Sequence, residues 1–509
     1  MLKNRRLRRL IPFAVVAIAV VAGQRHRLAT PPDAPTASPT SVPGPAAAPR
    51  TLLRGSLRLT ECDLAAPRTP FASVAAYCAS VPVPEDRSHP QGRHISLRIA
   101  LIPATAEKRA TDAVTFLDGG PGGAALSDFP LVAHAFAPLL KSRDILLIDQ
   151  RGTGQSNAFE CPSSTETDVR KRVSACAAHV STYADPQFYT TLDATADLDD
   201  VRAKLGYPTL TLIGVSYGTR VAQIYARDYP RSVRAIVLDS PVPNTLTLGS
   251  EHALNLDASL QARFAICVSD RRCRDRFGDP RRMLQSLLEQ LDAHPLDVTV
   301  DDPVTHAKRS EHLTRAGLAQ LVRFYAYSPQ TAALLPLTLD EARAGRYQAL
   351  LGQLLLVQGD LSTRLDGPME LSVLCSEDAP LLQNRPEDAQ TILGPAFVQQ
   401  AQAACAVWPH APMPKDFHAP LTGSVPTLLL SGEFDPVTPP RYAHEIAHHL
   451  TQASVLVLPG QGHSVMGIGC APDVVERFVS HASLVNLEAE CLQRERATPF
   501  FLGYAGAAP

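Results

Sequence analysis

The chain of 509 residues is long for one domain and favours two or more units, or one large domain with an insertion. Its apolar content of 45% and charged content of 19% are ordinary for a globular protein with a sizeable core. The formal net charge of −2 excludes a global basic field, so we expect no nucleic-acid partner.

The N-terminus has the pattern of an export signal. Basic residues within the first nine positions precede an apolar run over residues 10–22, which is signal-peptide length and short for a membrane span. Small residues near Gly23 allow cleavage, whereas Arg25 and Arg27 allow an uncleaved anchor, and both stay open. We expect an exported protein, periplasmic or secreted, with residues 1–23 as signal or anchor and this segment as its only membrane contact. Residues 24–55, rich in Pro and Ala, are predicted to be a linker.

The ten cysteines agree with export. An even number without a C-x-x-C repeat favours disulfides over zinc, with reduced core thiols as the alternative. Local pairing is the simplest interpretation. The sequence-adjacent pairs are Cys62 with Cys78, Cys161 with Cys176, Cys267 with Cys273, Cys375 with Cys405, and Cys470 with Cys491. Closing a loop of about 15 residues contributes roughly 3 kcal/mol.

Short apolar segments alternate with segments of helical spacing through much of the chain. Strands are predicted at residues 94–103, 113–117, 144–149, 209–213, 233–239, 425–431 and 453–459. Helical spacing over residues 193–205 and 219–228 flanks the strand at 209–213. Apolar strands that alternate with helices imply an α/β fold with a mostly parallel sheet covered on both faces.

A mainly helical block interrupts this pattern. Residues 283–291, 313–327 and 349–356 have helical spacing and are expected to belong to an inserted cap. The resulting division is 56–243 for the first part of the core, 244–419 for the cap, 420–491 for the second part of the core, and 492–509 for a tail.

Gly214, Ser216 and Gly218 form a G-x-S-x-G pattern between a predicted strand and a predicted helix. A nucleophile elbow needs a sharp turn that lifts the serine Oγ from the backbone, and side chains at the two glycines would collide with the neighbouring strand and helix. Three fixed positions alone are a weak signal. The strand, turn and helix nevertheless occur in the required order, so Ser216 is predicted to be a nucleophile.

Asp435 and His463 supply the partners that a serine nucleophile needs. The hydroxyl requires a base, and the base requires an orienting carboxylate. Each residue follows a predicted strand, and the order Ser, Asp, His is that of α/β-hydrolases. Singly, they read equally well as a turn aspartate and a loop histidine, but together with Ser216 they predict a catalytic triad.

Two backbone N–H groups are expected to bind the oxyanion. One comes from Tyr217, the residue after the nucleophile. The glycine-rich turn at residues 119–123 is the natural source of the other, because its glycines let the backbone approach a substrate closely. A plain glycine-rich loop is the alternative. A phosphate-binding loop is excluded, since no Gly-Lys-Ser/Thr follows.

The pattern H-E-x-x-H occurs at His444, Glu445 and His448. In zinc peptidases the histidines are ligands and the glutamate is the general base. However, the segment lies where an α/β-hydrolase needs its penultimate helix. A buried stripe on that helix is expected from Tyr442, Ile446 and Leu450. A zinc peptidase is therefore kept as a remote alternative, and no metal or cofactor is predicted.

Together these motifs resemble the proline iminopeptidase and tripeptidyl aminopeptidase branch of the α/β-hydrolases. The similarity covers most of the chain from Cys78 to Cys491. The motifs that carry it are residues 119–123, 149–156, 214–219, 435–439 and 462–463.

The resemblance implies a role for each matching residue. It makes Ser216 the nucleophile, His463 the base and Asp435 the orienting carboxylate, with oxyanion donors at the N–H groups of Gly120 and Tyr217. Residues 149–156 would brace the site. One departure is Asp118, where many relatives carry histidine, and it leaves the choice of substrate end open.

The implied function is an aminopeptidase that cleaves peptides with a free N-terminus through an acyl-enzyme. A carboxylate near the site would favour the charged amine. Glu377 and Asp378, in the predicted cap, are candidates, although a solvated acidic turn explains them equally well. A carboxylesterase or lipase with the same triad is the main alternative. Epoxide hydrolase and dehalogenase chemistry is disfavoured, because those enzymes use a carboxylate at the elbow.

Overall fold

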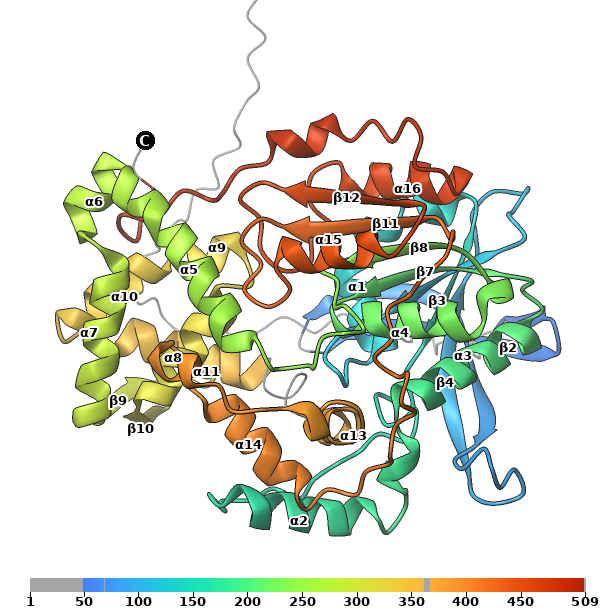
Figure 1. Ribbon diagram of the computed structural model, residues 1–509, viewed down its shortest axis with the longest axis horizontal. Helices are drawn as coiled ribbons and strands as arrows, with labels where there is room; N and C mark the ends of the chain where they lie inside the picture. The colour runs from blue at the N-terminus through green and yellow to red at the C-terminus, as the bar shows by residue number, and fades with distance from the viewer. Residues whose placement is uncertain (1–48, 68, 361–366, 508–509) are drawn as a thin grey trace, which may run out of the picture. The chain divides into compact units, whose positions relative to one another are not determined.

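A ten-stranded sheet forms the centre of the computed structural model, which describes residues 49–67, 69–360 and 367–507 (Figure 1). Its strand order is β1-β2-β3-β4-β6-β5-β7-β8-β11-β12. The strands are β1 Thr51–Arg54, β2 Leu57–Ala66, β3 Thr69–Pro84, β4 His94–Ile102, β5 Ala113–Leu117, β6 Asp144–Ile148, β7 Leu210–Val215, β8 Val233–Asp239, β11 Thr427–Gly432 and β12 Ala453–Leu458.

The sheet is antiparallel at one end and parallel through the rest. Neighbours from β1 to β4 pair antiparallel, as do β4 and β6, whereas all pairs from β6 to β12 are parallel. Because parallel strands end at the same edge, the segments that follow β5, β7, β8, β11 and β12 are gathered there. The predicted mostly parallel α/β fold is confirmed.

Helices cover both faces of the sheet, and each face has its own apolar core. One core contains side chains of α3 Thr191–Leu205, α4 Tyr217–Asp228 and α15 Pro440–His448. The other contains side chains of α1 Ala125–Phe136 and α16 Ala471–His481. Successive residues of β7 alternate between them: Leu212 belongs to the first core and Ile213 to the second.

Helix α3 shows how local sequence sets an element that reaches the site. Thr190 and Asp193 form a capping box at its start, with each side chain bound to the other residue's backbone N–H. The helix stops at Gly206, whose left-handed φ of 77° suits glycine. These signals fix where α3 begins, and hence the position of Thr191 beside α4, the helix that follows Ser216 and is called the elbow helix below.

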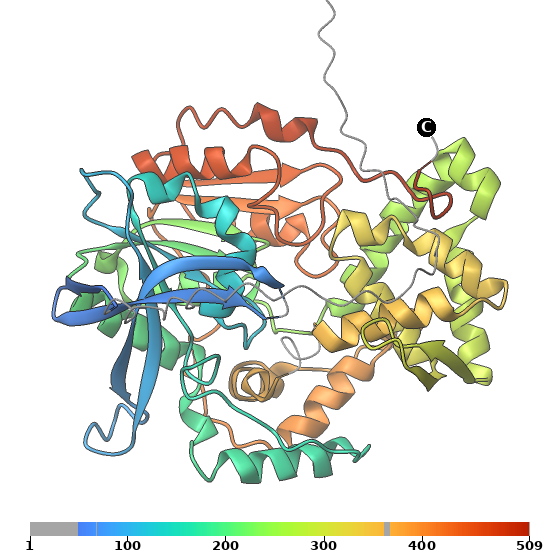
Figure 2. The ribbon, with the colours of Figure 1, turned by 180° about the vertical axis from the view of Figure 1, so that it is seen from behind.

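The antiparallel end of the sheet extends further than predicted (Figure 2). Strand β1 lies within the segment predicted to be a linker, and it pairs with β2 from Thr51 opposite Thr60 to Arg54 opposite Leu57. Composition favours an irregular segment here, but β2 supplies hydrogen-bond partners that no local pattern shows.

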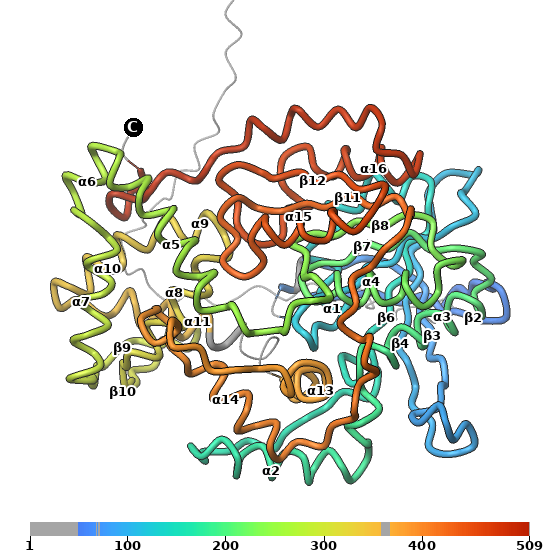
Figure 3. Tube along the Cα trace, in the orientation of Figure 1, coloured from blue at the N-terminus to red at the C-terminus, as the bar shows by residue number. Residues whose placement is uncertain are grey.

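The segment between β8 and β11 is mainly helical, and its course is clearest in the tube view (Figure 3). A hairpin of β9 Leu296–Asp301 and β10 Lys308–Leu313 interrupts it. Consequently the helix predicted over residues 313–327 begins later, because Leu313 ends β10 and Thr314 caps α8. The helices are α5 His252–Ser269, α6 Arg271–Phe277, α7 Pro280–Ala293, α8 Arg315–Tyr325, α9 Pro329–Ala332, α10 Leu335–Arg343, α11 Gln348–Asp360, α13 Pro368–Glu377 and α14 Ala396–Cys405. We call residues 244–419 the cap.

The cap has an apolar core of its own, formed by leucines of α5, α7, α8, α10 and α11. Core and cap are also joined by the predicted tail. Phe500, Phe501 and Leu502 pack on Cys267 and Phe277 of the cap. Farther back, the carbonyl of Arg496 accepts a hydrogen bond from Gln461, which precedes the predicted base.

Five disulfides join the cysteines in the sequence-adjacent pairs. They are Cys62–Cys78, Cys161–Cys176, Cys267–Cys273, Cys375–Cys405 and Cys470–Cys491. Disulfides are typical of oxidising compartments, so they agree with export. The predicted signal or anchor lies outside the described residues, and within the described part no helix combines the length and apolarity needed to cross a membrane.

Candidate active site

Ser216 lies in a sharp turn between β7 and α4. Its φ of 54° and ψ of −123° are unusual for a residue with a side chain, and such a conformation costs about 1–3 kcal/mol. The glycines on either side have steric reasons. A side chain at Gly214 would strike the carbonyl of Gly218 in α4, and one at Gly218 would strike the carbonyl of Leu117 at the end of β5. The elbow therefore presents the serine hydroxyl away from the sheet.

Asp435 and His463 lie in contact at the carboxyl edge of the sheet. His463 Nδ1 is 2.8 Å from Asp435 Oδ2, and the two side chains are 8% and 0% exposed. The carboxylate also accepts hydrogen bonds from the N–H groups of Val437 and Thr438 and from the Thr438 hydroxyl. With Nδ1–H donating to Asp435, the Nε2 of His463 is left to act as the base.

The pKa values of this pair shift in opposite directions, each toward the charged form. Burial alone would raise the pKa of Asp435, but the charge and hydrogen bond of His463 and the backbone donors outweigh burial, so the pKa is lowered. Burial alone would lower the pKa of His463, yet the Asp435 carboxylate raises it overall. The lowered pKa favours the anionic form of Asp435 beside the imidazole of His463.

Ser216 and His463 line the same cavity of about 470 Å³. Gly119, Gly120 and Tyr217 also line it, and a Cβ at Gly119 would lie 3.1 Å from the Ser216 Cβ. The walls are largely apolar and include Phe116, Leu131, Val132, Phe136, Val242, Leu248, Phe397 and Met466. The cavity therefore combines a serine, an oriented histidine and a close-lying glycine turn.

The predicted oxyanion donors lie at this cavity. Tyr217 is the first residue of α4, where helix N–H groups have no partner within the helix and carry partial positive charge. In the glycine turn, the N–H of Gly119 donates to the Asp118 carboxylate over 2.8 Å. Gly120, rather than Gly119, is therefore the expected second donor.

The structure corrects the expectation that Glu377 or Asp378 binds a substrate amine. Both side chains are fully buried, and neither lines the cavity. Asp378 pairs with Arg220 of α4 at 2.8 Å. Glu377 accepts hydrogen bonds from the N–H and hydroxyl of Thr191, at 2.6 and 2.9 Å. A buried carboxylate needs such partners, and these two residues join the cap to the elbow helix.

Tyr217 is held by the same cluster. Its hydroxyl lies 2.6 Å from that of Thr191, which also contacts Glu377. Burial raises the pKa of Glu377 to about 8, with the Asp378 charge adding to the rise and Arg220 opposing it. The cluster therefore fixes the side chain of a residue whose N–H is an expected oxyanion donor.

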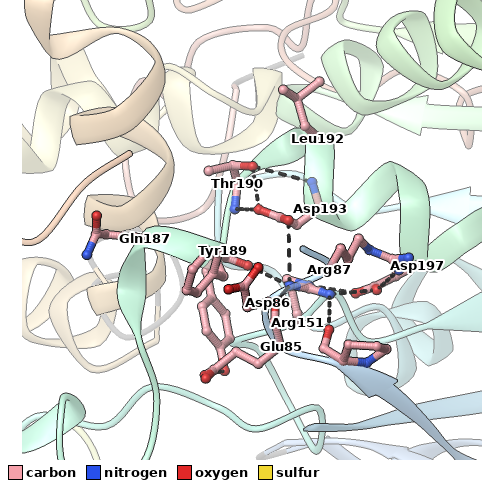
Figure 4. A network of polar contacts seen from close by, with 12 residues as sticks. Glu85, Asp86, Arg87, Arg151, Gln187, Tyr189, Thr190, Leu192, Asp193 and Asp197 are labelled. Carbon is pink, nitrogen blue, oxygen red and sulfur yellow. Dashed lines mark hydrogen bonds and ion pairs between the residues drawn. The ribbon is translucent and has the colours of Figure 1, made fainter. Parts of the chain in front are cut away.

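Residues 149–156 make the contacts expected of a brace. Arg151 is fully buried and forms two 2.7 Å hydrogen bonds to Asp197 of α3, while also binding the carbonyls of Glu85 and Phe188 (Figure 4). Bidentate arginine–carboxylate contacts are among the stronger polar interactions. They tie the loop after β6 to the middle of α3.

The H-E-x-x-H residues do not gather at a site. His444, Glu445 and His448 are exposed on α15, and Glu445 contacts the Thr245 hydroxyl. Tyr442 and Ile446 supply the buried face of the helix. Within the described part of the chain, no group of three or more His, Cys, Asp and Glu residues could hold a metal ion.

Sequence reasoning missed Asp239, which supports the loop that carries His463. Its buried carboxylate accepts hydrogen bonds from the N–H groups of Val465 and Met466 at 2.9 Å, and burial raises its pKa to about 6. The sequence did contain a signal for this role, because Asp239 is the last residue of the strand predicted at residues 233–239.

The chain is similar to several hydrolases. It is 25% identical to the serine protease Hip1 of Mycobacterium tuberculosis over 474 residues, covering 82% of this chain and 87% of the relative. It is 30% identical to a tripeptidyl aminopeptidase of Streptomyces lividans over 214 residues, covering 37% and 39% of the two chains. Among solved structures, the proline iminopeptidase of Mycobacterium smegmatis aligns with a TM-score of 0.35 and 16% identity, over 82% of this chain and all of that one.

The family assignment rests on a match to a family model that spans more than half of the chain. The model of the alpha/beta hydrolase fold family matches residues 112–468, a span that begins just before β5 and includes Ser216, Asp435 and His463. The chain therefore belongs to the α/β-hydrolase fold family.

Proposed function

We propose that the protein is an exported serine peptidase that releases residues or short peptides from the N-terminus of peptide substrates. The observation that carries the proposal is the elbow serine at one cavity with the Asp435–His463 pair. Similarity to a serine protease over 82% of the chain supports a peptide substrate, and similarity to a tripeptidyl aminopeptidase supports action at the N-terminus.

The proposed reaction proceeds through an acyl-enzyme. Ser216 Oγ attacks the scissile carbonyl carbon while His463 Nε2 takes the hydroxyl proton. The resulting oxyanion accepts hydrogen bonds from the N–H groups of Gly120 and Tyr217. His463 then gives its proton to the leaving amine. Water, deprotonated by His463, then attacks the acyl carbon. The bond from that carbon to Ser216 Oγ breaks, His463 returns the proton to Oγ, and the new carboxylate is released.

The cavity walls support a substrate with an apolar side chain and a cationic end. The apolar lining suits the residue next to the scissile bond. A charged α-amine would meet the carboxylates of Asp118, Asp128 and Glu370, which line the cavity together with Arg323. These groups replace Glu377 and Asp378 as the proposed surroundings of the amine.

A second cavity of about 860 Å³ supports a substrate longer than a simple ester. It lies against α2 Val169–Val180, α8, α13 and α14, and it shares lining residues with the first cavity. The shared residues are Arg323, Glu370, Leu374 and Phe397. These four residues lie between the two cavities, and a peptide that occupies both cavities would contact them from both sides.

We further propose that the protein acts in the periplasm or outside the cell, with the N-terminal segment as signal or anchor. The disulfides support this location. Determining the N-terminus of the mature protein from cell fractions would distinguish cleavage from anchoring.

The test compares purified wild type with Ser216→Ala on alanyl, prolyl and tripeptidyl anilides. The N-acetylated tripeptidyl anilide is the matched control, because it differs only in lacking the charged amine. We expect hydrolysis of free-amine anilides by the wild type, a much weaker reaction with the acetylated one, and loss of both in Ser216→Ala. Serine-directed phosphonates should inhibit and chelators should not.

A carboxylesterase is the second candidate, favoured by the largely apolar cavity, which also suits an acyl chain. Short-chain nitrophenyl esters distinguish the two. Hydrolysis of esters without hydrolysis of any anilide would reject the peptidase and retain the serine mechanism. Peptidase activity that survives Ser216→Ala would reject the mechanism itself.

A further inference from the structure

Three polar side chains of the cap helix α5 lie against the turn that carries Asp435. Asn255, Ser259 and Arg263 are spaced four residues apart, which places them on one face of the helix. All three are buried, at 2%, 6% and 4% exposure. A polar stripe on a buried helix face needs partners, because unpaired polar groups are costly to bury.

The partners are backbone carbonyls of the Asp435 turn. Asn255 Nδ2 donates to the carbonyl of Val437 over 2.8 Å, and Ser259 Oγ donates to that of Phe434 over 2.8 Å. Arg263 Nη2 donates to the same Phe434 carbonyl over 3.3 Å, and its guanidinium lies 5.1 Å from the Phe434 ring centre. The N–H groups of this turn meanwhile bind the Asp435 carboxylate. The turn is thus held from both sides.

Arg263 also reaches the part of the cap that contacts the base. It donates to the carbonyl of Ala326 over 3.5 Å, at the end of α8. The next residue, Tyr327, accepts the peptide N–H of His463 over 2.7 Å. A Cβ at Gly462 would strike the Tyr327 carbonyl and lie 3.1 Å from Arg263 Nη2. Arg263 therefore lies between the Asp435 turn and the loop that carries His463.

We propose that Arg263, assisted by Asn255 and Ser259, is a positioning residue for the Asp435–His463 pair, so that the cap forms part of the catalytic apparatus. The inference rests on the proposed serine mechanism. None of the three side chains contacts the reacting atoms. They act by fixing the turn that orients the base, where a displacement of about 1 Å can cost about 10²-fold in rate.

The charge of Arg263 gives this role a signature that packing alone would not produce. Burial lowers the pKa of Arg263 to about 10, which leaves it cationic at neutral pH, with Asp435 and Glu433 as the nearby anions. His463 faces Asp435 and Asp239 as anions, and His252 interacts with it as well. Arg263 Nη2 would lie 3.1 Å from a Cβ at Gly462, the residue before His463. Replacing Arg263 with an uncharged residue therefore favours the imidazolium form of His463 and should raise its pKa.

The experiment compares Arg263→Lys, Arg263→Met and Ser259→Ala with two controls. Ser269→Ala changes a hydroxyl of the same helix that donates to the carbonyl of Ile266 one turn earlier, and Arg276→Met changes a cap arginine paired with Asp340. The readouts are kcat, KM, the pH dependence of kcat/KM and the thermal midpoint. The substrate is whichever anilide or nitrophenyl ester the wild type cleaves, since both reactions use the triad.

We expect Arg263→Met and Ser259→Ala to lower kcat about 10-fold to 10²-fold with little change in KM. Arg263→Met should also move the acidic limb of kcat/KM to higher pH. Arg263→Lys should keep that limb in place and regain part of kcat, and both controls should behave as wild type.

Unchanged kcat and pH dependence in Arg263→Met and Ser259→Ala, with only a lower thermal midpoint, would overturn the proposal. If Arg263→Met fails to fold, the kcat of Arg263→Lys and of Ser259→Ala decides. Failure of the serine mechanism is recognised separately, because Ser216→Ala would then remain active whatever the α5 variants do.

Discussion

The peptide N–H of His463 donates to the carbonyl oxygen of Tyr327, and the Tyr327 ring packs edge-on against the imidazole at 5.1 Å between centres. One residue is the predicted base on the core, and the other follows helix α8 of the cap. This contact means that the cap is continuous with the active site, so changes at the boundary between them should alter catalysis.

Gly462→Ala tests that boundary directly. The new methyl group would strike the Tyr327 carbonyl, so the cap and the base loop must separate. We expect a loss of kcat of about 10²-fold or more, measured with the anilide substrates. Gly352→Ala is the matched control, because a Cβ at Gly352 in α11 meets no atom within 4 Å. Equal activities of the two variants would contradict the expectation.

Asp435→Asn should lower kcat by about 10⁴-fold, the scale seen when the triad carboxylate is neutralised. The carboxylate is also what raises the pKa of His463 against the opposing effect of burial. Without it, the pKa of His463 falls, and the base stays neutral to lower pH. The acidic limb of the kcat/KM profile should therefore move to lower pH. A limb that keeps its position would show that another group controls it.

Glu377→Gln should change how stability depends on pH. The pKa of Glu377 rises from an ordinary value of 4.5 to about 8 in the folded protein, chiefly through burial. Between these values the folded state keeps a proton that the unfolded state releases. The stabilisation is full below about 4.5 and is lost as pH rises through about 8.

Thermal midpoints measured from pH 5 to 9 should thus fall more steeply for the wild type than for Glu377→Gln. The exposed Glu387, changed to glutamine in the same way, serves as control. Glu377→Gln also tests whether Glu377 binds the substrate amine. Its KM for free-amine and N-acetylated peptides should change equally. A KM that rises only for the free-amine peptide would support amine binding by Glu377.

Removing the Cys375–Cys405 disulfide by paired alanine substitutions should destabilise the protein by roughly 3–4 kcal/mol. The bond joins α13 to α14 and has a sequence separation of 30 residues. Cys267–Cys273, with a separation of 6, should cost roughly 2 kcal/mol on the same chain-entropy basis. Denaturant unfolding of both paired variants measures the two losses in unfolding free energy. A larger loss for the Cys267–Cys273 variant would contradict the prediction.

The sequence predicted the elements of the site that depend on local order. The G-x-S-x-G glycines and the ends of the apolar strands predict where Ser216, Asp435 and His463 lie along the chain, because an elbow and a parallel sheet impose those positions. The strand at residues 51–54 was not predicted, since its hydrogen bonds come from β2.

Contacts between distant segments could not be predicted from the sequence, because the partners of each residue come from another part of the chain. Glu377 and Asp378 look like a solvated acidic turn until Arg220, more than 150 positions earlier, is brought beside them. The stripe on α5 has helical spacing, but nothing local shows that its polar face meets carbonyls of the Asp435 turn. Such pairings depend on the tertiary arrangement and leave no mark in a short window.

The position of the cap within the chain has a consequence for how activity arises. Ser216 precedes the cap, whereas Asp435 and His463 follow it, and the cap's α5 and α8 hold both of the later residues. A chain made from its N-terminus carries the elbow long before it carries an oriented base. Chains that end before His463 would therefore lack the base, so that activity can arise only after the cap and the segment that follows it have been made.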